Sequence, residues 1–159
     1  MKFRVAVIIV ASVLLAALVA FFAMQYTPSN VLTYVRAGAM EINNGVLTVP
    51  EQYTVIEDEA LAGRIEFDTV IIEGEADIGS RAFYNCTNLS RVVINKDCNI
   101  GSEAFADCPE LVNIVVRSGG GSCAEDAFYG HGGAVVHCVE GSSVWEVARR
   151  ADMSVRGLE

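Results

Sequence analysis

Two segments of the chain repeat one another: Ile78-Gly79-Ser80-Arg81-Ala82-Phe83-Tyr84-Asn85-Cys86-Thr87-Asn88-Leu89 and Ile100-Gly101-Ser102-Glu103-Ala104-Phe105-Ala106-Asp107-Cys108-Pro109-Glu110-Leu111. They lie 22 residues apart, and the Ile, Gly, Ser, Ala, Phe, Cys and Leu positions are unchanged. The β-branched runs that follow, residues 92–94 and 114–116, keep the same spacing. Recurrence at a fixed period of 20–50 residues predicts a solenoid of stacked coils.

Weaker copies flank the two central ones. Upstream, residues 56–61 lie 22 residues before the first copy, with a strand-like run at 70–72. Downstream, residues 123–128 follow at an offset of 23, with a run at 135–138. Four copies, degraded at both ends, are typical of a short capped solenoid, because each coil buries its apolar side only against its neighbours.

Alternation along each strand predicts which side chains face the core. In the first copy Leu89, Val92 and Ile94 are expected to point inward and the residues between them outward. A Gly after the inward Ile lets the chain turn, and the Ala-Phe pair then packs a helical or irregular turn beneath the strand. Stacking buries each large side chain, which stabilises the fold by roughly 1.5–3 kcal/mol per residue.

The repeat resembles that of the BspA-like leucine-rich-repeat family of cell-surface proteins, Ile-Gly-x-x-Ala-Phe-x-x-Cys-x-x-Leu followed by an alternating strand. Both central copies match every fixed position, and the resemblance covers about residues 46–156. The outer copies depart from it, with Leu61 in place of Phe and with Arg64 or His131 in place of Cys. The resemblance implies a β-rich leucine-rich-repeat solenoid of short parallel strands and a role in adhesion or host-surface binding.

Caps are expected at both ends of the stack. Residues 40–49 read as a hairpin with Asn43-Asn44-Gly45 at its tip. After Gly141, the sequence Ser143-x-x-Glu146 matches a capping box that opens a helix through about Ala151, followed by a final strand at 153–155. The predicted organisation is a membrane anchor or signal at 1–24, a tether at 25–39, a solenoid with its hairpin cap at 40–141, and a helix-strand cap at 142–159.

The N-terminal segment predicts one transmembrane helix before the solenoid. Twenty consecutive residues, 5–24, carry no charge, which is long enough to cross a bilayer. Lys2 and Arg4 precede them, so the N-terminus is expected in the cytoplasm and the repeats outside. A cleaved signal peptide, which would make the protein secreted, is the main alternative, although the apolar run is long and Leu18 and Phe21 fit a cleavage site poorly. A buried soluble helix is the third reading.

Charge excludes one class of partner. All 20 acidic residues and nine of the 11 basic ones follow the apolar segment, which gives the remainder a formal net charge of −11. Nucleic acid is therefore not expected as a partner, because no basic patch is available to neutralise phosphates. The acidity is interpreted as an aid to solubility rather than as a cation-binding device.

The outward face of the stacked strands is the candidate site, and a protein or other surface macromolecule is the expected partner. An aliphatic row, expected to be exposed, lies between two polar rows of mixed charge, an arrangement that suits a partner. The competing interpretation is that β-branched residues simply favour strands. The three rows are Thr69, Arg91 and Asn113; Ile71, Val93 and Val115; and Glu73, Asn95 and Arg117.

The cysteines and histidines do not assemble a recognisable catalytic or metal site. Cys86 and Cys108 occupy one repeat position, about 4.8 Å apart across coils, within disulfide range, but the family resemblance places that Cys in the core as a free thiol. His131 continues this column, yet a column is not a tetrahedral ligand set. No cofactor, metal or catalytic residue is predicted. The expected function is a membrane-anchored, extracytoplasmic binding or adhesion module; a scaffold or assembly subunit without its own ligand is the alternative, and an enzyme the third class.

Overall fold

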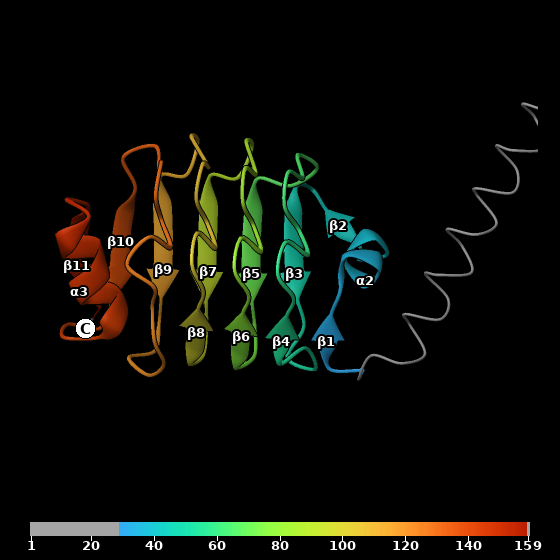
Figure 1. The fold of residues 1–159 in the computed structure, drawn as a ribbon, viewed down its shortest axis with the longest axis horizontal. Coiled ribbons are helices and arrows are strands. Elements are labelled where there is room, and N and C mark those ends of the chain that lie inside the picture. The colour runs from blue at the N-terminus through green and yellow to red at the C-terminus, as the bar shows by residue number, and fades with distance from the viewer. Residues whose placement is uncertain (1–28, 159) are drawn as a thin grey trace, which may run out of the picture.

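The computed structural model describes residues 29–158, and these form a single stack of coils (Figure 1). The predicted leucine-rich-repeat solenoid is thereby confirmed. The predicted transmembrane segment, residues 5–24, lies outside the described residues. Within residues 29–158 no helix has both the length and the apolar character needed to span a bilayer.

A seven-stranded sheet runs along one side of the stack, in the order β11-β10-β9-β7-β5-β3-β2. Its six parallel strands repeat without a register shift, so that Ile71 pairs with Val93 and Val93 with Val115. Only the short β2, in a hairpin with β3, runs antiparallel. The strands are β2 (Ile42–Asn43), β3 (Val46–Val49), β5 (Thr69–Ile72), β7 (Arg91–Ile94), β9 (Asn113–Val116), β10 (Val135–Cys138) and β11 (Ser154–Gly157).

A second parallel sheet, which the sequence did not predict, forms another side of the N-terminal part of the stack. Its order is β1-β4-β6-β8, with strands of two or three residues. Strands this short give no alternation long enough to recognise in the sequence, and pairing between coils is what aligns them. They are β1 (Val31–Leu32), β4 (Val55–Ile56), β6 (Ala76–Ile78) and β8 (Cys98–Ile100).

The turn that closes each coil is held by a third set of hydrogen bonds between coils. Arg81, Phe83 and Asn85 donate their backbone N–H groups to carbonyls of the next coil, at 2.8–2.9 Å. Arg81 and Asn85 adopt left-handed conformations, with φ of 57° and 55°. Such conformations are unfavourable for residues other than glycine, and we attribute their repetition to these hydrogen bonds, which only a stacked neighbour provides.

The core lies between the two sheets and the turns. Phe83, Phe105 and Phe128 form one continuous column, with ring centroids 5.0 Å and 5.8 Å apart and nearly parallel planes. Cys86 and Cys108 are free and fully buried, which confirms the expected buried thiols over a disulfide. Their S–H groups donate to backbone carbonyls of the preceding coil at 3.2 Å and 3.3 Å, so each thiol is a satisfied part of the core.

The N-terminal hairpin is confirmed, and its turn consists of Asn44 and Gly45. Both residues have positive φ, 51° and 79°, as a two-residue hairpin turn of type I′ requires. The tight turn matches the twist of the paired strands and therefore fixes the register of β3 against β2. The first parallel strand of the large sheet is thus set by a local signal.

The C-terminal cap forms as predicted, but its helix α3 (Ser143–Arg150) begins from a different residue. Ser142, not Ser143, is the N-cap, and its hydroxyl accepts the backbone N–H of Trp145 at 3.2 Å. Ser143 instead donates its hydroxyl to the carbonyl of Gly121 in the preceding coil, at 3.1 Å. The predicted capping box was therefore wrong by one residue, because packing against that coil occupies the second serine.

The predicted tether, residues 25–39, was wrong over the part that the structure describes. Strand β1 pairs with β4, and helix α2 (Tyr34–Gly38) follows it. Leu32 and Ala37 are fully buried, and Thr33 caps the helix by accepting the N–H of Arg36 at 3.3 Å. The reason is that the first coil has no preceding coil, so this segment covers the apolar end of the stack.

Candidate partner-binding face

The structure places the nine predicted site residues on the outer surface of the seven-stranded sheet, which we call the strand face. The pairings of β5, β7 and β9 align Thr69 with Arg91 and Asn113, and Ile71 with Val93 and Val115. Glu73, Asn95 and Arg117 follow the ends of the same three strands. The predicted rows are therefore brought together as expected, and rigid backbone pairing holds them.

The aliphatic row is less exposed than predicted. Val93 at its centre is only 6% exposed, and Ile71 and Val115 beside it are half-buried. Strands about 4.8 Å apart place each β-branched side chain against its row neighbours, which cover the central one from both sides. The row is therefore a filled, flat apolar seam, and its two outer members offer most of its accessible surface.

Polar groups of the flanking rows retain capacity to bind. Within the described residues, Arg91 and Arg117 are exposed and form no ion pair or hydrogen bond through their side chains. The Oδ1 atom of Asn113 is buried and also lacks a hydrogen-bond partner there. Asn95 differs, because its Nδ2 donates to the carboxylate of Glu73 at 2.9 Å. The two exposed guanidinium groups are available to bind carboxylate or carbonyl acceptors of a partner, whereas Asn113 Oδ1 is an unsatisfied acceptor inside the face.

Sequence reasoning missed three members of the middle row. His137 pairs in register with Val115, Arg156 with His137, and Thr48 with Ile71, so the row extends across β3, β10 and β11. His137 lies 22 residues after Val115, and this spacing was the signal that could have found it. The strand face is thus a six-strand surface with a half-buried imidazole and an exposed guanidinium near its C-terminal end.

The buried thiols are poorly suited to nucleophilic chemistry. Burial raises the pKa of Cys86 to about 12 and that of Cys108 to about 11. Thiols with such pKa values stay protonated at neutral pH, and the thiolate is the reactive form.

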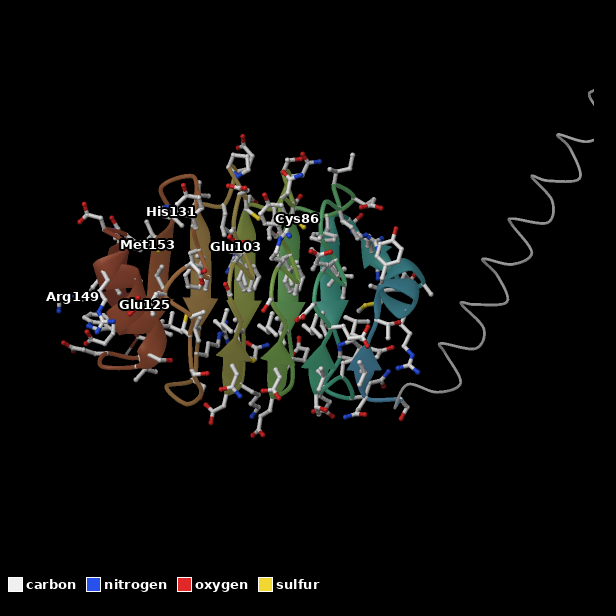
Figure 2. All side chains as sticks on the ribbon, in the orientation of Figure 1. Cys86, Glu103, Glu125, His131, Arg149 and Met153 are labelled. Atoms are coloured by element: carbon white, nitrogen blue, oxygen red, sulfur yellow. The ribbon has the colours of Figure 1, made fainter. Side chains whose placement is uncertain are left out.

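His131 does not act on the cysteine column. Its Nδ1 accepts the backbone N–H groups of Gly133 and Ala134, at 3.1 Å and 3.3 Å, so it shapes the loop before β10. Figure 2 shows Cys86 and His131 along the same edge of the stack. Among the described residues no group of three or more His, Cys, Asp or Glu side chains could hold a metal ion.

Three features define a leucine-rich-repeat solenoid. Parallel strands repeat in register, leucine and phenylalanine side chains stack in the core, and the strand face carries aligned rows of residues. The family model for the BspA type leucine rich repeat region, in six copies, matches residues 39–134. The chain belongs to this family. Membership suggests a protein-binding or adhesion module. Neither a comparison with curated proteins nor one with solved structures gave a match.

Proposed function

We propose that the chain is a membrane-anchored, extracytoplasmic binding module that holds a partner protein against its strand face, and that it acts by binding rather than by catalysis. The observation that carries this proposal is the combination of a flat apolar seam with the exposed, unpaired guanidinium groups of Arg91 and Arg117 beside it. Apolar area gives such a contact affinity, and the flanking charges give it orientation.

The proposed anchor rests on the apolar run at residues 5–24 and the two basic residues before it. The proposed extracytoplasmic side follows from the same positive-inside rule. The intact mass of the purified chain tests the anchor directly. A mass that includes residues 1–24 supports an uncleaved helix, whereas a mass that lacks them shows a removed signal and a secreted domain.

The binding test uses the full-length chain in non-ionic detergent and a two-residue charge reversal on the strand face. Arg91→Glu with Arg117→Glu changes exposed side chains and leaves the core untouched. Val93 is unsuitable, because a carboxylate at this buried position would be expected to unfold the coil. Arg149→Glu with Arg150→Glu is the matched control; both residues are exposed and lie in α3, outside the strand face, and Arg149 is at the C-terminal end of the stack (Figure 2). The exposed ion pair of Arg150 with Glu125 contributes little to stability.

Partners are captured from the cells that make the protein, and those retained by the wild-type chain are compared between the two variants. We expect the strand-face variant to lose at least one partner that the control variant retains. Capture of the same set by wild type and both variants would contradict the proposal. Circular dichroism spectra of all three chains establish that each is folded.

A further inference from the structure

The four-stranded sheet carries a continuous trough on its outer side, away from the strand face. Three adjoining hollows of about 580, 400 and 770 Å³ make it up. The first two share Asp77 and Asn99, and the last two share Thr54 and Glu75. The hollows are therefore one depression that crosses β4, β6 and β8.

Glycines of the repeat contribute to this hollow. Gly79 and Gly101 line it, in the position after the inward Ile. A Cβ on Gly101 would lie 2.8–2.9 Å from backbone atoms of the coil before it, and one on Gly79 would lie 2.5–2.8 Å from atoms of Asp58 and Glu57. The close stacking of the coils therefore excludes side chains from this row, and the absence of side chains leaves a recess along it.

Carboxylates dominate the walls of the trough. Six acidic residues from three successive coils line it, against one basic residue, Lys96. All but Glu57, which is half-buried, are exposed. The six are Glu51, Glu57, Asp58, Glu75, Asp77 and Asp97.

These carboxylates have no basic partner within the described residues. The ion pairs there join Arg64 to Glu66, Arg81 to Glu59 and Glu103, and Arg150 to Glu125, all outside the trough. Inside it, Asp77 accepts a hydrogen bond from Asn99 Nδ2 at 2.6 Å, and Asp97 accepts one from the backbone of Gly120 at 3.0 Å. Neutral donors orient these two carboxylates but leave their charge uncompensated.

We propose that the trough binds an extended, lysine- or arginine-rich peptide segment of a partner protein. A single metal ion fits poorly, because no three acidic side chains among the described residues converge on one point. The carboxylates are instead spread over three coils, about 10 Å at the usual strand spacing. An extended peptide presents side chains on one side about every 6.8 Å, so two cationic side chains fit within this length.

The test measures binding of a fluorescein-labelled ten-residue peptide of alternating Lys and Ser to the full-length chain in non-ionic detergent at low salt, by fluorescence anisotropy. The matched peptide carries Gln at each Lys position. The trough variant combines Glu57→Gln, Glu75→Gln and Asp77→Asn. Its control variant combines Glu110→Gln, Glu140→Gln and Glu146→Gln, which change the net charge equally outside the trough.

We expect the wild-type chain to bind the Lys peptide and not the Gln peptide, and the trough variant to bind it about tenfold more weakly. This factor corresponds to about 1.4 kcal/mol shared among three carboxylates, two of them exposed and one half-buried. The control variant should bind the Lys peptide less than twofold more weakly than the wild-type chain. No binding by the wild-type chain, or equal weakening in both variants, would overturn the proposal.

A second measurement locates the peptide independently of any variant. A Lys-Ser peptide with a central benzoylphenylalanine is photo-crosslinked to the wild-type chain, and the products are mapped by mass spectrometry. We expect crosslinks within residues 51–58, 75–79 and 97–101. Crosslinks confined to the strand face would overturn the proposal that the trough binds the peptide. The proposed binding of a partner to the strand face is tested separately, by the charge-reversal variants.

Discussion

The phenylalanine column offers a quantitative test of how stacking between coils stabilises the fold. Phe105 is fully buried between Phe83 and Phe128, and it forms two stacked pairs. Each such pair contributes about 0.5–1.5 kcal/mol beyond the area that it buries. Phe105→Leu keeps an apolar side chain but removes both pairs, so stacking alone should cost about 1–3 kcal/mol.

Two further substitutions supply the matched series. Phe128→Leu removes one stacked pair, and Phe67→Leu removes none among the described residues, although Phe67 is equally buried. All three changes carry the same cost for the smaller side chain, about 1 kcal/mol. The predicted loss of stability is therefore largest for Phe105→Leu, intermediate for Phe128→Leu and smallest for Phe67→Leu.

The assay is urea unfolding of the full-length chain in non-ionic detergent, followed by far-ultraviolet circular dichroism. Fluorescence of the single tryptophan, Trp145, reports separately on the C-terminal cap. Coincident transitions would show that the stack unfolds as one unit, which the comparison of free energies requires. Equal losses for Phe105→Leu and Phe67→Leu would refute the reasoning, since the column would then contribute only buried area.

Three further changes test other parts of the fold. Gly101→Ala should lower the free energy of unfolding by about 1–3 kcal/mol, because the new Cβ would lie 2.8–2.9 Å from backbone atoms. Gly157→Ala is the control. It has open space around the new Cβ and should change the free energy of unfolding by less than about 0.5 kcal/mol. Ser142→Ala should cost about 1 kcal/mol by removing the N-cap of α3. Equal urea midpoints for wild type and Ser142→Ala would contradict the assigned cap. Burial raises the pKa of the Cys86 and Cys123 thiols to about 12 in the folded chain, so unfolding releases protons above pH 9. The free energy of unfolding should therefore fall between pH 9 and pH 11. A constant value over this range would contradict the burial of these thiols.

Much of the strand face followed from the sequence, because a fixed offset transfers the position of one residue to every coil. The alternation in residues 89–95 placed Leu89, Val92 and Ile94 inward, and all three are fully buried. The same offset placed Arg91 and Asn113 in one row. What the offset could not supply was the degree of exposure, since Val93 is covered by row neighbours that belong to other coils.

The trough illustrates the opposite case. Gly79 and Gly101, which line it, recur in the repeat and were recognised from the sequence. Its other lining residues come from turns and short strands that carry no recognisable pattern. Asp77 and Asn99 lie 22 residues apart, yet nothing in that spacing says that Glu51 or Asp97 lies in the same depression. Only the superposition of coils brings these carboxylates together.

The sequence by itself determined the repeat period, the inward and outward sides of the long strands, the hairpin and the alignment of Cys86 with Cys108, while the burial of these two thiols was implied by the family resemblance. These features are local or periodic, so a single coil and its offset specify them. Tertiary structure alone decided the second sheet, the folded segment before the hairpin, the choice of Ser142 as a cap and the shape of the trough. Each of these depends on hydrogen bonds or packing between coils, and the energy of such contacts exists only after the coils have stacked.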